Sequence, residues 1–456
     1  MNKNDSTQRP SGSRAQHRVR TVSVAALLVM AIAGCDVTNP GPVQDEFLNL
    51  NEAHAAMVNG AQRQITWGLN WIVLHTAHSA REYVAGGQTG PGGVLTTAQN
   101  GQLLPQDGGV NEVWQAMHQG RWIAEDAIRR FTDGELTSNV SANTLVDAYL
   151  WAGYANKILG ENMCASVFDG GPAGDASLHS ARAEQHFTSA LAGGPSADQR
   201  LAALAGRAAT RMFMGDWAGA VTDATAVPLD YTKFIEVDAT AAEQTENVIW
   251  AGTFPAYGIR AQSVHFTWFY DYFTDTGDPR AAWDIDPARP IASANLTGFG
   301  AVPWSFPTNK HITGGEDIRL AGGTEMVLIR AEALLRDNNM QGAMDLINSI
   351  RTAVISETTM LALDPWTATT MEEAWTALKR ERAIEFWLEG KRMADIRRWS
   401  GNVLTFESPP TQIVPGILDW PDWEGLLGFF FQDNKPSKCF PIPDDELDTN
   451  LNLESR

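Results

Sequence analysis

The spacing of apolar residues predicts helices over most of this chain. In the stretch from Trp375 to Trp399, apolar side chains recur every three or four residues, and one helix face carries Ala374, Ala377, Ile384 and Leu388. Gly390 is typical of a helix end, and a second short helix is expected from Lys391 to Trp399. The stretch therefore predicts a helical hairpin.

Charged residues interrupt the apolar face of this hairpin. Glu381 falls within the apolar stripe, and Glu385 and Glu389 follow it at spacings of four, where like charges repel one another. A carboxylate in such a place needs a partner. The expected counter-charges are three nearby arginines, Arg380, Arg382 and Arg392. The pattern predicts a partly buried network of ion pairs.

The helical pattern recurs as four two-helix units with the spacing of tetratricopeptide repeats. Small residues recur where helices must cross closely, and large residues fill the space between them. A coincidental run of amphipathic helices is the alternative. The units are marked by a helix at 145–160 with Ala183, Phe187, Ala190 and Pro195; by Leu204, Ala208, Gly215, Trp217, Ala220 and Ala224; by Val327, Ala331, Leu334, Asn338, Ala343 and Ile347; and by the hairpin at 375–399.

Two regions lack this helical pattern. Residues 230–320 are rich in aromatic, Gly, Pro and Asp residues, and residues 401–439 carry Trp420, Trp423 and a run of three phenylalanines. Before the repeats, helices are expected at 51–70 and 111–131, joined by a Gly-rich loop. The predicted fold is mostly α, with a tetratricopeptide-like scaffold of about four helix pairs at about 145–228 and 325–400. A large loop-rich insertion at about 230–320 and an irregular C-terminal region at 401–456 are expected to cover part of this scaffold.

The formal net charge of −20 limits the class of partner. Residues 1–34 carry five basic side chains and one acidic side chain, so a chain without them has a formal charge of −24. Such acidity argues against nucleic acid or anionic lipid as a partner.

The N-terminus has the form of a bacterial lipoprotein signal. Basic residues precede an apolar run from Val22 to Ile32, which is too short to span a bilayer and ends just before Cys35. In that class of signal Cys35 becomes the lipidated first residue; the alternative is a chance cysteine after an ordinary cleavable signal. Cys164 and Cys439 then allow at most one disulfide, and their pairing stays open. The predicted parts are a signal peptide at 1–34, a lipidated cysteine and tether at 35–50, and one domain at 51–456.

Several motifs together resemble one family. The sequence LIRAEALLRDNN with INSIR (328–351), the sequence RERAIEFWLEGKRMADIRRW within the hairpin, Asp278-Pro279-Arg280, and the closing Pro441-Ile442-Pro443 are similar to those of the SusD/RagB family of outer-membrane nutrient-binding lipoproteins. The chain departs from the family pattern at Ala124-Glu125-Asp126, where many members have Ala-Asn. The usual Asn-Pro-Gly-Tyr is also absent after Asn450.

The resemblance implies a lipid-anchored binding protein on the cell-surface side of the outer membrane. Such a protein captures a glycan, oligosaccharide or peptide and passes it to a SusC-like TonB-dependent barrel transporter. It does no covalent chemistry and contacts the membrane through its lipid anchor only. In the family, ligands are held by loops of the early segment and of the insertion. The hairpin residues that match the family signature would then be structural ion partners: Glu381, Arg382, Glu389, Arg392 and Asp395.

Aromatic residues in these two segments are the candidate ligand-binding groups, because a sugar ring packs its C–H face on a flat aromatic ring. Trp283 and Trp304 stand in contexts that look too polar or too turn-like for a core. The alternative for any single tryptophan is a place in the core. Trp420 and Trp423 could equally face the transporter. The candidates are Trp67, Trp71, Arg81, Tyr83, Trp268, Tyr270, Trp283, Asn295 and Trp304.

Other chemistries have weaker support. Glu385 and Glu389 would be about 5–6 Å apart at Cβ on a helix, but two acids on one helix face cannot readily flank a sugar, so a glycoside hydrolase is disfavoured. His75 and His78 lack a third metal ligand, and no cofactor is expected. The segments 275–278 and 284–286 are acidic enough for calcium but lack the ligand spacing of a known loop. A tetratricopeptide scaffold that binds only proteins stays as an alternative.

Overall fold

The computed structural model describes residues 45–85, 101–134, 139–238, 246–253, 260–265, 267–292, 303–399 and 437–453. Residues 49–456 form one compact unit, and residues 1–48 form another. Among the described residues, no helix combines the length and the apolar character needed to cross a bilayer. The predicted signal peptide with its apolar run from Val22 to Ile32 lies outside the described ranges, as do Cys35, Asn295, Trp420 and Trp423.

Helices dominate the described part of the chain. The α-helices are α2 (Asn51–Ser79), α3 (Gly108–Thr132), α4 (Ala142–Asn162), α5 (Ser177–Ala192), α6 (Ala197–Met214), α7 (Trp217–Thr225), α8 (Val248–Thr253), α9 (Trp268–Thr276), α10 (Gly323–Arg336), α11 (Met340–Arg351), α12 (Met371–Glu385), α13 (Arg392–Trp399) and α15 (Asp444–Thr449). Two short 3-10 helices are η1 (Asp45–Asn49) and η3 (Pro279–Ala281).

Within the described ranges, the strands are short and pair in twos. They are β1 (Val84–Ala85), β2 (Ala165–Val167), β3 (Ala173–Asp175), β4 (Thr232–Ile235), β5 (Gln262–Ser263), β6 (Trp283–Asp284), β7 (Phe306–Pro307) and β8 (Ile318–Gly322). The antiparallel pairs are β1–β5, β2–β3, β4–β8 and β6–β7. The β4–β8 pair brings the two ends of the insertion together. The helical repeats therefore resume, at α10, close to where they stop before the insertion.

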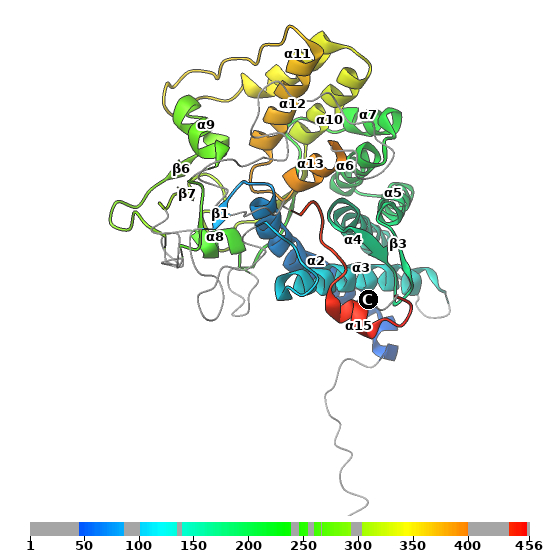
Figure 1. Ribbon diagram of the computed structural model, residues 1–456. Helices are drawn as coiled ribbons and strands as arrows, with labels where there is room; N and C mark the ends of the chain where they lie inside the picture. Colours follow the sequence, from blue (N-terminus) through cyan, green and yellow to red (C-terminus); the bar gives the residue numbers. More distant parts are fainter. Residues whose placement is uncertain are drawn as a thin grey trace, which may run out of the picture. The chain divides into compact units, whose positions relative to one another are not determined.

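The four predicted repeats are confirmed as the pairs α4/α5, α6/α7, α10/α11 and α12/α13. Helix α7 packs against α10, so the third repeat follows the second in space although the insertion separates them in sequence (Figure 1). The turn residues Gly215, Asn338 and Gly390 have φ angles of 83°, 59° and 72°. Asparagine tolerates this left-handed conformation better than most side chains, which explains how Asn338 replaces glycine.

Close helix crossings in the scaffold depend on size differences between facing residues. Phe187 on α5 is fully buried, and it lies against Gly153 on α4 and Gly206 on α6. A Cβ atom at Gly153 would lie 2.7 Å from the Phe187 ring, and one at Gly206 would lie 2.4 Å from it. The large ring therefore fills space that only glycine leaves on both neighbouring helices.

Two predicted helix ends are wrong. Helix α2 continues to Ser79 rather than ending near residue 70, and its last turns are buried almost all round because α3, α4, α8 and α13 contact it. A helix buried on all sides has no clear polar face, so the periodic signal fades. Helix α12 ends at Glu385, several residues before Gly390, and its C-cap residue Phe386 already leaves the helical conformation. Beyond it, Leu388 takes a left-handed φ of 59°.

The C-terminal segment, residues 437–453, returns to the N-terminal helices. Cys164 and Cys439 form a disulfide, which answers the pairing that the sequence left open. Next to it, the Cys164 N–H donates to the Phe440 carbonyl at 2.9 Å, and the Ser437 N–H donates to the Gly101 carbonyl at 2.8 Å. The segment thus ties the end of the chain to the loop before α3 and to the end of α4.

Candidate functional site

The insertion holds a group of stacked aromatic side chains, which we call the aromatic cluster: His265, Trp268, Tyr270, Tyr272, Phe273 and Trp283. Most of it lies on α9, which begins where the Thr267 hydroxyl accepts the Tyr270 N–H and ends at Gly277 in a left-handed conformation. The sequence treated these aromatics as non-helical, which is wrong for Trp268 and Tyr270.

Two nearly parallel ring pairs form the cluster. Tyr270 and Trp283 stack with centroids 4.0 Å apart and an interplanar angle of 13°. Trp268 and Tyr272 stack at 4.5 Å with the same angle. The Trp283 indole N–H donates to the Tyr270 carbonyl at 3.0 Å, which fixes the first pair. These are preferred aromatic geometries, and each pair is worth about 1 kcal/mol beyond its burial.

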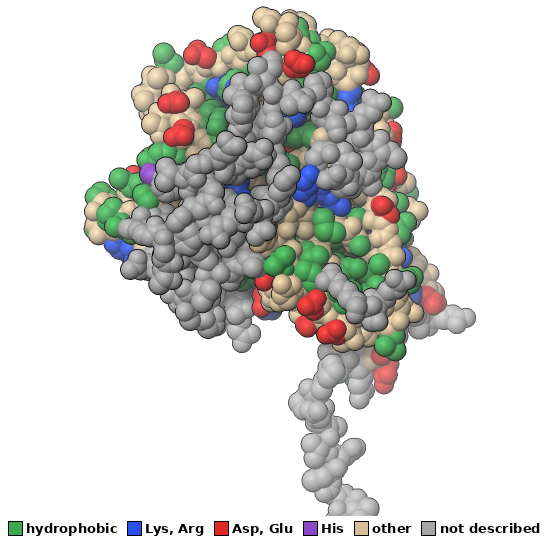
Figure 2. All heavy atoms as spheres, in the orientation of Figure 1, with side chains coloured by type: hydrophobic (Ala, Val, Ile, Leu, Met, Phe, Trp, Pro, Cys, Tyr) green, Lys and Arg blue, Asp and Glu red, His purple; other side chains and the backbone are tan. Residues whose placement is uncertain are grey.

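The cluster is partly open to solvent. Trp268, Tyr270 and Trp283 are half-buried, whereas Phe269 on the opposite side of α9 is fully buried against Trp387. Ile285, just after Trp283, is 44% exposed. Hydrophobic side chains are visible on the side where β6 and β7 lie (Figure 2). The cluster therefore offers apolar surface to a ligand without being a bare core.

Three exposed acidic residues lie on α9 and β6, the elements that carry most of the cluster. Asp271, Asp275 and Asp284 are exposed, and within the described residues none of the three forms a salt bridge. Burial raises the pKa of Tyr270, and the charge of Asp271 adds to this effect. Burial lowers the pKa of His265, so its ring is neutral at pH 7. The site combines neutral rings with negative oxygen acceptors, a combination that suits hydroxyl groups and disfavours anions.

The structure brings only part of the predicted ligand-binding set together. Trp67 and Trp71 are half-buried on α2, not on a loop. Arg81 is 2% exposed, Tyr83 is fully buried and Trp304 is 1% exposed. The interpretation of Trp304 as too turn-like for the core is wrong. The Trp304 backbone N–H donates to the Pro290 carbonyl at 2.9 Å, a tertiary contact that its local sequence does not reveal.

Three members of the cluster were not among the sequence candidates. His265 meets the Tyr270 ring edge-on at 4.4 Å, Phe273 meets Trp283 edge-on at 5.9 Å, and Tyr272 stacks on Trp268. A signal was present for the last one, because residues 268 and 272 are four apart and share one face of a helix. It was missed because α9 was taken as loop.

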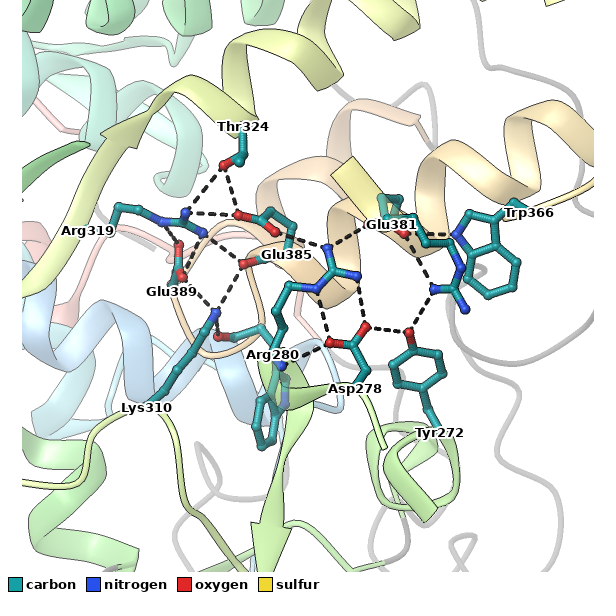
Figure 3. A network of polar contacts seen from close by, with 12 residues as sticks. Tyr272, Asp278, Arg280, Lys310, Arg319, Thr324, Trp366, Glu381, Glu385 and Glu389 are labelled. Atoms are coloured by element: carbon teal, nitrogen blue, oxygen red, sulfur yellow. Dashed lines mark hydrogen bonds and ion pairs between the residues drawn. The ribbon is translucent and has the colours of Figure 1, made fainter. Parts of the chain in front are cut away.

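The acidic residues of the hairpin form a second polar site, distinct from the aromatic cluster. Glu385 and Glu389 line a cavity of about 300 Å³ together with Arg280, Lys310 and Arg319. Figure 3 shows the polar contacts among these residues. The counter-charges of the two glutamates come from the insertion, 66 to 105 residues away in sequence, rather than from Arg380, Arg382 and Arg392 as predicted. Arg382 pairs instead with Asp395 at 2.7 Å, and Arg392 donates to the Ala80 carbonyl.

Two of the cations in this cavity, Arg319 and Lys310, have no hydrogen-bonding capacity left for a ligand. The Arg319 guanidinium makes five hydrogen bonds, four to carboxylate or carbonyl oxygens of Glu385 and Glu389 and one to Thr324. Lys310 Nζ donates to Glu389 at 2.8 Å and to two backbone carbonyls. A guanidinium has five N–H donors and an ammonium has three, so both are saturated.

The carboxylates are held ionised. Burial alone would raise the pKa of Glu389, but the charges of Arg319 and Lys310 outweigh it and lower the pKa to about 2. The pKa of Glu385 is also lowered, chiefly by Arg319 and Arg280, against the effect of burial. A general acid needs a raised pKa, so this pair does not have the electrostatics of a glycosidase.

Several of the histidines and aspartates that the sequence suggested as metal ligands lie among apolar or cationic groups. Burial lowers the pKa of His75 to about 4 and of His78 to about 3, and the ring of His75 lies edge-on to Phe440. Asp278 is buried and bonded to Arg280, and Asp286 pairs with Arg289 at 2.8 Å. Among the described residues, no three His, Cys, Asp or Glu side chains gather as a metal would require.

A second cavity of about 660 Å³ lies between α2 and the chain that follows β4. Asn59, Gln62 and Arg63 line it from α2, and Glu236 and Asp317 line it from the other side. No aromatic residue is among its described lining residues, so it offers no ring on which a sugar could stack. The aromatic cluster is therefore the better candidate for a ligand surface.

Comparisons with known proteins agree with this fold. Residues 302–455 match the sequence model of the SusD family. A SusD superfamily protein from Bacteroides vulgatus has a similar structure, with a TM-score of 0.61 and 14% identity over 90% of this chain and 98% of that one. A SusD-like carbohydrate binding protein from Bacteroides fragilis has a TM-score of 0.61 and 14% identity over 89% of this chain and all of that one.

A second SusD-like carbohydrate binding protein, from Bacteroides vulgatus, has a TM-score of 0.54 and 16% identity over 76% of this chain and 82% of that one. No curated protein sequence matches the chain. At these identities the structural likeness shows a shared fold, while the match over residues 302–455 is one of sequence.

Proposed function

We propose that this protein of the SusD/RagB family captures a glycan or oligosaccharide at the cell surface and delivers it to a TonB-dependent outer-membrane transporter. Lipidation of Cys35 would anchor it, and residues 36–50 would tether it. The family match and the carbohydrate-binding relatives support a glycan more than a peptide as the ligand. SusD family proteins are associated with the outer membrane, which fits this location.

The observation that carries the proposal is the half-exposed stack of Tyr270 and Trp283. A pyranose ring can pack its C–H face on such a surface, while Asp271 and Asp284 accept hydrogen bonds from its hydroxyls. The insertion that carries the stack is also where the family places its ligand loops. A neutral sugar fits this site best, because the neighbouring carboxylates would repel an anionic one.

The second polar site supports binding without catalysis. Glu385 and Glu389 are saturated with fixed cations and kept ionised, so neither is available as a proton donor. The same residues join the hairpin to the insertion. They serve the scaffold on which the aromatic cluster stands.

Replacement of Trp283 by alanine tests the proposed site. The chain from residue 36 to 456 would be screened on a glycan and peptide array, and the affinity for the best ligand would be measured by calorimetry. Trp283→Ala should weaken glycan binding by about 5-fold to 30-fold, because loss of a stacking ring costs about 1–2 kcal/mol. Trp122→Ala is the matched control, since Trp122 is 50% exposed on α3, away from the insertion.

Two results would count against the proposal. One is a wild-type chain that binds no glycan at millimolar concentration, and the other is a folded Trp283→Ala variant with wild-type affinity. Capture of proteins alone, with no small ligand, would favour a tetratricopeptide scaffold instead. Co-purification with a barrel protein of the outer membrane would test the delivery step separately.

A further inference from the structure

A series of buried polar contacts joins the aromatic cluster to the fourth repeat. It begins at Tyr272, whose ring stacks on Trp268 and whose hydroxyl is buried. That hydroxyl donates to Asp278 Oδ2 at 2.6 Å and accepts from Arg351 Nη1 at 2.9 Å. Asp278 is itself fully buried, so it needs every partner it has.

Arg280 continues the series into the scaffold. Its Nη2 donates to Asp278 Oδ2 at 2.8 Å, and its Nη1 donates to Glu381 Oε1 at 2.6 Å and to Glu385 Oε2 at 3.1 Å (Figure 3). A single guanidinium therefore bridges a carboxylate beside the cluster and two carboxylates of α12. Its planar fork suits this arrangement, whereas the point charge of a lysine would not span it.

The turn that carries Asp278 and Arg280 separates the two halves of the Tyr270–Trp283 stack. Tyr270 lies on α9 before the turn, and Trp283 begins β6 just after η3. The turn is closed by the Asp278 side chain, which accepts the Arg280 N–H at 3.0 Å. Fixing this turn on the fourth repeat thus sets the separation of the two stacked rings.

Charge and protonation agree with this geometry. Burial alone would raise the pKa of Asp278, but the hydrogen bonds and charge of Arg280 and the Tyr272 hydroxyl hold the pKa below its usual value. Burial and the charge of Asp278 raise the pKa of Tyr272, so its hydroxyl keeps its proton. At pH 7 the contact is therefore a hydroxyl donating to a carboxylate, which is one of the stronger kinds of hydrogen bond.

We infer that Tyr272, Asp278 and Arg280 are positioning residues for the proposed glycan site. They hold α9 and β6 on the fourth repeat so that Trp268, Tyr270 and Trp283 keep their stacked arrangement. The inference rests on the proposed function for its ligand, but the positioning itself does not need a ligand to be observed. Buried ion pairs add little net stability compared with apolar packing, so a role in geometry is the better account of their presence.

Two conservative variants test the inference. Tyr272→Phe keeps the ring under Trp268 and removes only the hydroxyl, and Arg280→Lys keeps the charge and removes the fork. Each should weaken glycan binding about tenfold, because a recognition site loses affinity when its rings are no longer held in place. The matched control is Arg207→Lys, since Arg207 makes a similar two-bond pair with Asp223, at 2.8 Å for each bond, in the second repeat.

Hydrogen exchange, read by mass spectrometry over residues 268–284, gives a measurement without ligand. Exchange there should rise in Tyr272→Phe and Arg280→Lys and stay at the wild-type level in Arg207→Lys. A purely structural role would lower the melting temperature of all three variants alike and leave affinity unchanged well below that temperature. Tyr272→Phe should fold even if Arg280→Lys does not, because it removes a single oxygen atom.

The outcomes separate this inference from the proposed function. If the wild-type chain binds a glycan but both folded variants match Arg207→Lys in affinity and exchange, the inference is overturned alone. If the wild-type chain binds no glycan, the proposed function fails, and with it the ligand part of the inference. Raised exchange at 268–284 would then still support the positioning of the cluster.

Discussion

Glu82 shows how one buried carboxylate can serve two distant parts of the chain. It follows α2 directly, is fully buried, and accepts the Leu388 N–H at 3.1 Å. Burial raises its pKa to about 7, although the charge of Arg392 opposes this. Leu388 lies in the left-handed turn after α12, so Glu82 is one of the groups that hold this turn in place.

The pH dependence of stability should therefore change in Glu82→Gln. The folded-state pKa of about 7 lies above the ordinary value of 4.5, so the folded protein binds an extra proton between these values. The stability that neutral Glu82 contributes is full below pH 4.5 and is lost as the pH rises toward 7. Glutamine stays neutral at every pH in this range. The free energy of unfolding of the variant should therefore rise relative to that of the wild type by at most about 3 kcal/mol between pH 4.5 and pH 7.

Thermal unfolding followed by circular dichroism from pH 5 to pH 8 measures this difference. The gap in melting temperature between Glu82→Gln and wild type should widen in favour of the variant up to about pH 7 and then level off. Glu372→Gln, at an exposed position of α12, should show no such trend. A gap that stays constant with pH would mean that Glu82 does not titrate in this range.

Glu125 shows how one carboxylate can link several helices. Its carboxylate accepts from Arg121 at 2.6 Å, from Asn156 at 2.9 Å, from Arg182 at 3.1 Å and from His186 at 3.2 Å. These partners lie on α3, α4 and α5. Burial would raise the pKa of Glu125, but the hydrogen bond from His186 and the charge of Arg121 lower it to about 2. The acid at this position thus links three helices of the scaffold.

At the scale of elements, the C-terminal segment depends on tertiary contacts rather than on its own structure. Its only helix, α15, has six residues, too few to be stable alone. Beside the disulfide, the Leu103 N–H donates to the Ser437 hydroxyl at 2.9 Å, and the Asn450 amide donates to the Gly171 carbonyl at 3.0 Å. The segment is therefore held by one covalent bond and by scattered hydrogen bonds to α3, α4 and the loops beside them.

Removing the disulfide should loosen this segment before it affects the repeats. The double variant Cys164→Ser, Cys439→Ser should lose about 2–5 kcal/mol of unfolding free energy, because the bond closes a loop of 275 residues. Hydrogen exchange should rise over 437–453 and 101–105 while the repeat helices keep their protection. The wild-type chain under a reductant should behave in the same way. Unchanged exchange over 437–453 would show that the noncovalent contacts suffice.

At the scale of the whole molecule, the large negative charge acts on any charged ligand at a distance. The formal charge is −20 for the full chain and −24 without residues 1–34. The exposed carboxylates Asp271, Asp275 and Asp284 add a local field of the same sign next to the aromatic cluster. Repulsion of this kind is screened by salt, with a Debye length of about 10 Å at 0.1 M ionic strength.

A sulfated oligosaccharide should therefore bind more weakly than its neutral counterpart, and its affinity should rise with ionic strength. The neutral sugar should show little salt dependence, because it carries no charge to be screened. Calorimetric titrations at about 20 mM and about 300 mM salt would measure both. Asp271→Asn should reduce the difference in affinity between the neutral and the sulfated oligosaccharide. Tighter binding of the sulfated ligand at low salt would contradict the expected site chemistry.

The helical scaffold could be predicted from the amino-acid sequence alone. The period of apolar residues and the turn positions Gly215, Asn338 and Gly390 specify four helix pairs, because these are local properties of the chain. The sequence motifs at 328–351 and in the hairpin are local as well. The same kind of reasoning showed that Glu381, Glu385 and Glu389 need counter-charges, since burial of an unpaired charge is costly wherever the partner comes from.

Which residues supply these counter-charges, and which aromatic residues are exposed, depends on contacts that form only when the chain folds. Arg280, Lys310 and Arg319 reach the hairpin from the insertion, and Trp304 is buried although its neighbours in sequence look like those of an exposed turn. The stacking of Tyr270 on Trp283 likewise depends on the turn between them, which Arg280 bonds to Glu381 of the fourth repeat. The periodic pattern of a helix depends on residues that are close together in the sequence. Ion pairs and exposure, in contrast, depend on segments that meet only after the chain has folded.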